Sequence, residues 1–97
     1  MSSVIVAEPA QQDLADLIHS HSLPTSTRDR VRRSIKPLGT FPLLGPALEG
    51  RWDGFRSILG PWPWMLIVYA YDEGADLVIV VTIQDTRSGR SPRGSLV

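Results

Sequence analysis

Residues 54–87 read GFRSILGPWPWMLIVYAYDEGADLVIVVTIQDTR, and this stretch decides the fold. Three runs rich in β-branched and aromatic residues are separated by short turns, which is the pattern of consecutive β-strands. The turns at Gly60-Pro61 and at 72–75 are too short for a crossover, so neighbouring strands must be antiparallel. We therefore expect a meander of three strands at about 51–59, 62–71 and 76–85.

The last of these strands, 76–85, is apolar on both of its faces. A strand of this kind lies in the middle of a sheet or is covered on each face by another layer. We therefore expect helices to cover one face of the sheet and a further segment to cover the other.

The N-terminal half of the chain predicts one strand and two helices. Residues 2–6 are rich in β-branched side chains and indicate a short strand. A first helix is expected over about Pro9–His21, where apolar residues recur at helical spacing. A second helix should begin in a capping box formed by Ser26 and Asp29 and end near Gly39. Because the link between the helices is short, the two should form a helical hairpin.

Between the helices and the meander, residues 39–50 hold three glycines and two prolines among apolar side chains. This composition predicts a loop that is pinned to the core. Together the elements predict an α+β domain over residues 1–87, with two helices packed on one face of an antiparallel sheet of about four strands. Residues 88–97 show no periodicity and are expected to form a disordered tail.

Composition narrows the class of protein. The 97 residues allow one domain with a modest core, and a 42% hydrophobic content is ordinary for a globular chain. The chain has no cysteine, which removes disulfides, thiolate metal sites and cysteine nucleophiles. We recognise no signal peptide and no apolar stretch long enough to cross a bilayer as a helix. The expected location is therefore the cytoplasm, without membrane contact.

The formal net charge is zero, but the ten cationic residues are unevenly distributed. Five of them fall within residues 28–36 and three within the last eleven residues. Local positive patches on a neutral protein are therefore expected, whereas a general polyanion binder would be more basic overall.

The order of strand, helical hairpin and three-stranded meander resembles the RelE/ParE superfamily of type II toxin–antitoxin toxins. The likeness extends over about residues 4–87. It rests on the segment after the hairpin, a Gly-x-Arg strand, an aromatic–apolar–Tyr strand and a last strand that closes on an arginine. These motifs are carried by Leu38, Phe41, Pro42, Gly45, Gly54, Arg56, Ile58, Trp64, Tyr69 and Arg87. The resemblance implies a toxin without a cofactor, neutralised by a cognate antitoxin in a hetero-oligomer.

Two activities occur within this superfamily. RelE-like toxins cleave mRNA in the ribosomal A site, and ParE-like toxins inhibit DNA gyrase. The resemblance therefore implies that the chain inhibits growth through one of these two targets. The alternative is a catalytically silent module of the same fold, retained for antitoxin pairing and transcriptional autoregulation.

Cleavage of RNA needs a group that activates the 2′-hydroxyl, a cation for the developing phosphorane charge and an acid for the leaving oxygen. The resemblance implies Arg56, Tyr69 and Arg87 as the catalytic candidates. Leu66 and Gln84 stand where the family commonly carries an arginine and a histidine, so the acid or base is missing. Both residues also have a structural interpretation. Arg56 would then cover apolar surface with the aliphatic part of its side chain, and Tyr69 would be an aromatic residue of the core.

Several other arginines are candidates for contacts with nucleic acid or with a protein target. These are Arg32, Arg33, Arg51 and Arg90. Clustered arginines of this kind also fit a solvated helix face or a solvated tail, so both interpretations stay open.

Trp52, Trp62 and Trp64 gather around two prolines and are candidates for an apolar patch that an antitoxin covers. Packing into the core is the alternative for at least one of them. His19 and His21 lie two residues apart, which is a poor spacing for one helix face. No metal site is therefore expected.

Overall fold

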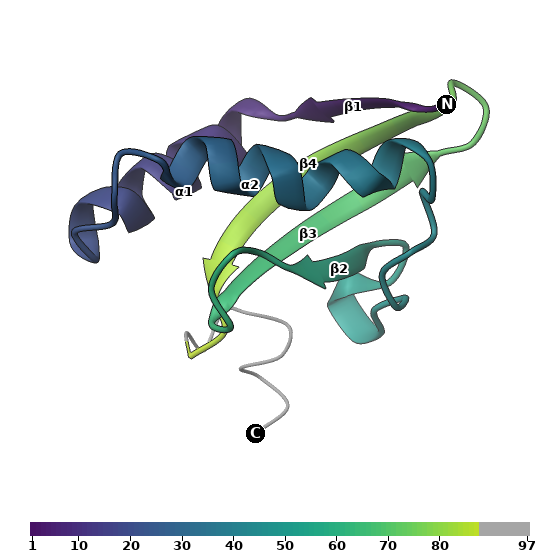
Figure 1. Ribbon diagram of the computed structural model, residues 1–97. Coiled ribbons are helices and arrows are strands. Elements are labelled where there is room, and N and C mark those ends of the chain that lie inside the picture. The colour runs from purple at the N-terminus through teal and green to yellow at the C-terminus, as the bar shows by residue number, and fades with distance from the viewer. Residues whose placement is uncertain (88–97) are drawn as a thin grey trace.

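The computed structural model describes residues 1–87 as a strand, two helices and three further strands, which is the predicted order (Figure 1). The elements are β1 (Ser3–Val6), α1 (Glu8–Ser20), α2 (Thr27–Ile35), the 3₁₀ turns η1 (Lys36–Gly39) and η2 (Gly50–Trp52), β2 (Arg56–Leu59), β3 (Met65–Asp72) and β4 (Leu77–Asp85). None of the helices in this part of the chain has the length and apolar character needed to span a membrane. The tail predicted for residues 88–97 lies outside the described residues.

The four strands form one sheet in the order β1-β4-β3-β2. The predicted meander is confirmed, since β2 pairs with β3, and β3 with β4, in antiparallel fashion. The prediction of a wholly antiparallel sheet is wrong at β1, which pairs in parallel with β4 from Ser3 opposite Leu77 to Val6 opposite Val80. The connection between these strands includes both helices and the other two strands, and a connection of such length permits parallel pairing.

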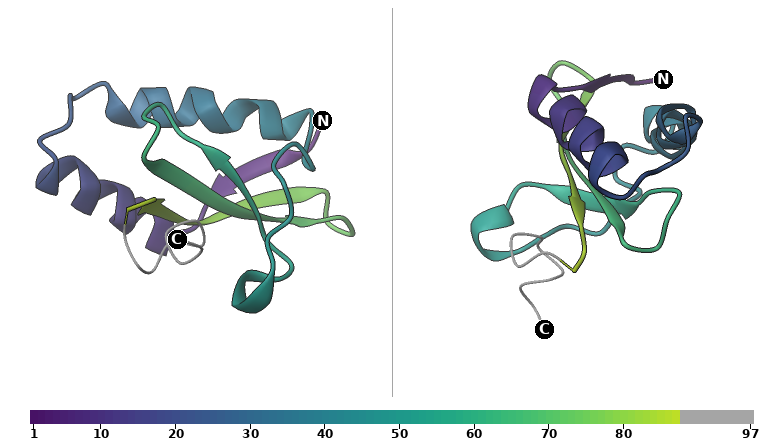
Figure 2. Two further views of the ribbon diagram at one scale, coloured as in Figure 1. Left: turned by 90° about the horizontal axis from the view of Figure 1, so that it is seen from below. Right: turned by 90° about the vertical axis from the view of Figure 1, so that its left-hand side faces the viewer.

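Both helices cover the same face of the sheet, as predicted (Figures 1 and 2). The core between the helices and the sheet consists of buried apolar side chains from α1, α2, η1, β3 and β4. Its members are Ala10, Leu14, Val31, Ile35, Leu38, Met65, Ile67, Tyr69, Val78, Val80 and Ile83. Every second residue of β3 from Met65 to Tyr69 belongs to this set, as the alternation of side chains along a strand requires.

A β-bulge decides which residues of β4 face the helices. The register between β3 and β4 shifts between Val68 and Tyr69, and this shift leaves Val81 as an extra residue in β4. Val80 and Ile83 therefore both belong to the core, although they lie three positions apart.

The opposite face of the sheet is also covered near its centre. Leu66 and Val68 alternate with the core residues of β3, so they point away from the helices, yet both are fully buried. The η2 turn lies on the side of the sheet away from the helices (Figure 2). This arrangement agrees with the expectation that a further segment covers the face of the sheet opposite the two helices.

The region before β2 differs from the strand predicted over 51–59. Gly50–Trp52 forms the turn η2, and extended pairing with β3 begins only at Arg56. Gly54 has a φ of +93°, in the left-handed region that favours glycine, and this conformation interrupts an extended backbone.

The predicted capping box at the start of α2 is wrong. Ser26 makes no capping hydrogen bond with its side chain, and its backbone is already in the helical region, at φ −77° and ψ −2°. A residue that caps a helix normally has an extended backbone. Asp29 instead accepts a hydrogen bond of 3.1 Å from Arg32 on the exposed side of the helix.

Candidate functional site

Tyr69 lies in the core and not at the surface. Its side chain is fully buried, and its hydroxyl accepts a hydrogen bond of 2.9 Å from the backbone N–H of Gly45. Burial raises the pKa of Tyr69 above its ordinary value of 10.0, so the phenol stays neutral. In this position the side chain holds the loop of residues 39–50 through Gly45.

Gly45 fits this loop because it has no side chain. A Cβ atom here would collide with the backbone carbonyl oxygen of Ser57 in β2. The close approach lets the N–H of Gly45 reach Tyr69 beneath it. The loop is therefore attached to the sheet, as its composition predicts.

Arg56 fastens the same loop from β2. Its Nη1 donates hydrogen bonds to the carbonyl oxygen of Gly45 at 2.8 Å and to that of Leu43 at 3.4 Å. The side chain is half-buried, and it lies on the same face of the sheet as Tyr69, its partner in the strand register. Arg56 thus binds carbonyl groups of its own chain.

Arg87 lies in a separate cluster with Asp85, His21 and Trp64. Its Nε and Nη2 donate to the two carboxylate oxygens of Asp85 at 2.9 and 2.7 Å, and its guanidinium lies 5.3 Å from the centre of the Trp64 ring. His21 stacks on Trp64 with 4.5 Å between ring centres, and its Nε2 lies 3.2 Å from Asp85. The hydrogen bonds from Arg87 hold the pKa of Asp85 well below its usual range. Asp85 is therefore ionised and a poor base.

The structure does not bring the three predicted catalytic residues together. In the strand register, Arg56 is opposite Tyr69, whereas Asp85, beside Arg87, is opposite Met65. Tyr69 and Met65 are four residues apart on β3, which corresponds to about 13 Å at ~3.3 Å per residue. Arg56 and Arg87 therefore serve two separate parts of the sheet.

The three tryptophans also occupy two places. Trp62 and Trp64 stack with 6.3 Å between ring centres and pack against the core, and Arg30 of α2 lies 5.6 Å from the Trp62 ring. Trp52 belongs to η2 and contacts Phe55 edge to face, with 6.1 Å between ring centres. The structure thus contains a stacked pair and a separate tryptophan in place of one patch of three.

The predicted target-binding arginines are equally dispersed. Arg32 and Arg33 are exposed on α2, Arg51 is exposed on η2, and Arg90 lies outside the described residues. Arg32 forms an ion pair of 3.1 Å with Asp29, but both side chains are largely exposed, so the pair contributes little to stability.

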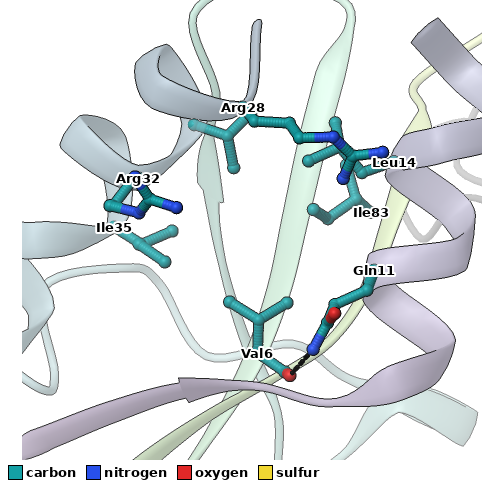
Figure 3. Close-up of a pocket in the computed structure, with 8 residues that line it drawn as sticks. Val6, Gln11, Leu14, Arg28, Arg32, Ile35 and Ile83 are labelled. Carbon is teal, nitrogen blue, oxygen red and sulfur yellow. Dashed lines mark hydrogen bonds between the residues drawn. The ribbon is translucent and has the colours of Figure 1, made fainter.

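An open groove with a volume of about 280 Å³ lies between α1 and α2 (Figure 3). Its floor is apolar and its rim is polar and cationic. The floor consists of Val6, Leu14, Val31, Ile35 and Ile83, and the rim of Gln11, Arg28 and Arg32. Arg28 extends from α2 toward Leu14 and Ile83 in Figure 3. We call this feature the interhelical groove.

A second cleft, of about 390 Å³, is lined by Arg51, Trp52, Phe55 and Gln84. Gln84 pairs in register with Leu66, so its side chain belongs to the sheet face away from the helices. The indole Nε1 of Trp52 and the amide Oε1 of Gln84 are both buried and have no hydrogen-bond partner among residues 1–87. We call this feature the outer cleft.

Sequence reasoning missed the contacts that connect α1 with β4. His21 meets Asp85, and the carboxylate of Asp13 accepts hydrogen bonds from the Thr82 hydroxyl at 2.5 Å and the Ile83 backbone N–H at 3.3 Å. Each of these pairs is separated by more than 60 residues, so no local spacing could have indicated it.

No family model and no curated protein matches the sequence. Solved structures do match the fold. One is the intact RelBE toxin–antitoxin complex of E. coli, with a TM-score of 0.63 and 12% identity over 88% of this chain and 96% of the other. The chromosomal ParDE system of P. aeruginosa gives 0.67 and 13% over 88% and 96%, and YafQ of E. coli strain BL21(DE3) gives 0.64 and 12% over 94% and 100%.

These identities are low, but the overlap extends over nearly the whole of each chain. The likeness therefore establishes a common fold. The resemblance to RelE/ParE toxins that the sequence suggests is confirmed at this level, and the chain has the α+β fold of toxins from toxin–antitoxin systems.

Proposed function

We propose that this chain is the toxin of a type II toxin–antitoxin pair, acts in the cytoplasm and is neutralised by a cognate antitoxin in a hetero-oligomer. The observation that carries the proposal is the interhelical groove. It has an apolar floor of mostly buried residues and a cationic rim, on a fold whose solved examples include toxin–antitoxin complexes. An apolar groove of this kind suits an amphipathic segment of a partner.

The charge of the groove indicates which segment would fit. Arg28 and Arg32 form its cationic rim, and the floor around Leu14 and Ile83 is apolar. The complementary partner segment has apolar residues at helical spacing flanked by carboxylates. We therefore place an acidic amphipathic segment of the antitoxin in this groove.

We further propose that growth inhibition results from binding to the translation machinery or to DNA gyrase, and that Arg56, Tyr69 and Arg87 do not act together in mRNA cleavage. Arg56 and Tyr69 are engaged with Gly45, and Arg87 is engaged with Asp85. Their strand partners on β3, Tyr69 for Arg56 and Met65 for Asp85 beside Arg87, lie four residues apart, so the two groups belong to different parts of the sheet.

A catalytically silent module of this fold is the second candidate. The observation that favours it is the bidentate pairing of Arg87 with Asp85, which occupies the guanidinium that a phosphate would otherwise bind. Such a module would bind the antitoxin through the same groove without arresting growth.

The test is expression of the chain alone in a bacterial host, with growth, transcript integrity and DNA supercoiling followed together. Growth arrest with changed supercoiling supports gyrase as the target, and arrest with inhibited protein synthesis supports the translation machinery. Arrest with cut transcripts that requires Arg56 would contradict our assignment of Arg56. Normal growth with ample folded protein would favour the silent module.

The interhelical groove as the antitoxin-binding site is tested by co-expressing the chain with the product of an adjacent reading frame. The double variant Arg28→Glu, Arg32→Glu should reduce co-purification of the two proteins and restore growth arrest. Arg33→Glu is the matched control, since Arg33 is exposed on the same helix but does not line the groove. If the antitoxin neutralised both variants equally, the interhelical groove would not be its binding site.

A further inference from the structure

The loop before β2 exposes three large apolar side chains within four residues. Phe41, Leu43 and Leu44 are 60%, 60% and 55% exposed. A single exposed apolar side chain is ordinary on a protein surface, but a contiguous group of them marks an interaction site. We call residues 41–44 the apolar turn. It lies in the connection from η1 to η2, beside β2 (Figure 1), and belongs to none of the contacts proposed above.

Hydrogen bonds fix the backbone of the apolar turn. The N–H of Leu44 donates to the carbonyl oxygen of Phe41 at 3.0 Å, which closes a β-turn with Pro42 at its second position, where the fixed φ of proline fits. The N–H of Phe41 donates to the carbonyl oxygen of Pro37 at 2.8 Å, and the contacts of Gly45 described above attach the other end to the sheet. The exposed side chains are therefore presented on a rigid support, and a partner that binds them has little backbone to order.

The charges next to the apolar turn indicate the charge of its partner. Arg33 and Lys36 line a hollow together with Pro37 and Thr40, directly before Phe41. Both cations are exposed, and neither forms an ion pair within residues 1–87. A complementary surface has carboxylates beside an apolar area. A second copy of this chain would instead bring the same cations together around the turn, which opposes self-association.

The form of the apolar turn separates its partner from the antitoxin segment. A flexible segment that folds on binding needs a groove to receive it, and the interhelical groove supplies one. A turn with exposed, fixed side chains has to be received by a concave site on a partner that is already folded. Leu43 and Leu44 have neither a ring to stack on a nucleobase nor a charge for a phosphate, so the partner surface is protein and not RNA.

We infer that the apolar turn inserts into an apolar cleft, bordered by carboxylates, on a folded protein target, and that this target is DNA gyrase. The inference rests on the toxin function proposed above and selects between its two targets. Gyrase offers protein surfaces, whereas the translation machinery offers mainly RNA. Phe41, Leu43 and Leu44 are the anchors of this contact, and Lys36 pairs with a carboxylate at its rim.

The experiment measures binding of the purified 97-residue chain to purified gyrase holoenzyme, together with inhibition of supercoiling. Leu43→Ser, and separately the double variant Phe41→Ser, Leu44→Ser, should each weaken binding and inhibition about tenfold or more, as truncation of an interface anchor does. Ile5→Thr is the matched control, because it removes an apolar side chain that is 48% exposed on β1, away from the turn. All of these side chains are exposed, so the melting temperature should stay unchanged and report that each variant is folded.

Two further variants separate the rim from the anchors and the target from the antitoxin. Lys36→Glu should weaken gyrase binding at low salt and have a smaller effect at high salt. The turn variants should still co-purify with the antitoxin, whereas Arg28→Glu, Arg32→Glu should still bind gyrase. Loss of the antitoxin from Leu43→Ser would assign the turn to the antitoxin and overturn the inference.

Several other results would overturn it as well. These are a natural chain that does not bind gyrase at micromolar concentration, equal gyrase binding by Leu43→Ser, and turn-dependent binding to 70S ribosomes or to phosphatidylglycerol vesicles. Dimers in sedimentation that Leu43→Ser dissociates would identify a second copy as the occupant. Growth arrest by the natural chain and by Leu43→Ser alike would contradict this inference and leave the toxin proposal standing. A folded natural chain that does not arrest growth would contradict the toxin proposal, and binding of purified gyrase would still decide the role of the turn.

Discussion

The backbone nitrogen of Gly45 donates a hydrogen bond of 2.9 Å to the hydroxyl oxygen of Tyr69, and this contact joins a surface loop to the centre of the sheet. Tyr69 is fully buried, and Arg56, its partner in the strand register, donates to the carbonyl oxygen of the same glycine. Both polar groups of the Gly45 backbone are thereby satisfied by the sheet. Two residues that the sequence suggests for catalysis are thus engaged in holding the loop.

Tyr69→Phe should destabilise the protein without affecting growth arrest. The substitution leaves the buried N–H of Gly45 without an acceptor, which costs about 1–2 kcal/mol in the free energy of unfolding. Urea denaturation measures this loss. Tyr71→Phe is the control, because the Tyr71 hydroxyl bonds to Asp76 in an exposed position and its loss leaves no buried group without a partner. A folded Tyr69→Phe protein that no longer arrests growth would return Tyr69 to the functional site.

The burial of the Tyr69 phenol should also make the stability of the protein fall at alkaline pH. The pKa of Tyr69 in the folded protein is raised above its ordinary value of 10.0 because the phenol is removed from water. Below pH 10 the phenol is neutral in both states, and its contribution to stability is fully present. As the pH rises above 10, the unfolded chain releases the proton first, so stability falls. Thermal unfolding at a series of alkaline pH values should show a steeper decline for the natural chain than for Tyr69→Phe.

Gly45→Ala should be far more damaging than an alanine at another glycine. The new methyl group would collide with the carbonyl oxygen of Ser57, and moving the loop would break the bonds to Tyr69 and Arg56. We expect a loss of about 3 kcal/mol in the free energy of unfolding. Gly74→Ala is the matched control, since its methyl group would meet only a side-chain oxygen of Asp72 at 3.5 Å. Similar melting temperatures for the two variants would contradict the described fit of the loop.

The main elements of the fold are predictable from sequence because they depend on local patterns. Apolar runs separated by the turns at Gly60-Pro61 and 72–75 give the meander, and helical spacing gives α1 and α2. The parallel pairing of β1 with β4 is not predictable in this way, because it depends on which edge of the sheet the chain meets after the crossover. The bulge at Val81 is likewise a property of two paired strands and not of either alone.

The candidate sites are less predictable because residue type does not reveal what a side chain faces. Arg56 has the right type and the right strand, but its guanidinium binds the loop beside it. Arg87 is paired by Asp85, two residues earlier, and His21 reaches the same cluster from the end of α1. Gln84 is recognisable in the sequence as a departure from the family pattern, and only the structure places it beside Trp52.

Asp85→Asn should remove an acid-sensitive part of the stability. Hydrogen bonds from Arg87 hold the pKa of Asp85 well below its value of 3.8 in the unfolded chain. The resulting stabilisation is present above pH 3.8 and is lost as the pH falls toward the pKa of the folded state. Near neutral pH we expect a difference of about 1 kcal/mol, limited by the exposure of Arg87.

The measurement is urea unfolding of both proteins between about pH 7 and pH 2, where the difference in unfolding free energy should shrink toward the acid end. Asp29→Asn is the control, because its ion pair with Arg32 is largely exposed and should contribute a few tenths of a kcal/mol at most. A difference for Asp85→Asn that stays constant across this range would show that the ion pair with Arg87 is not its source.

Arg56→Met tests whether Arg56 serves the loop or a target. Methionine keeps an apolar side chain of similar length but cannot donate to the carbonyl oxygens of Leu43 and Gly45. We expect a loss of about 1 kcal/mol in stability and faster hydrogen exchange at the Gly45 amide, with growth arrest retained. Arg33→Met, an exposed substitution on α2, should leave exchange at Gly45 unchanged. If Arg56→Met abolished growth arrest while exchange at Gly45 stayed slow, Arg56 would contact the target directly and its attachment to the loop would be secondary.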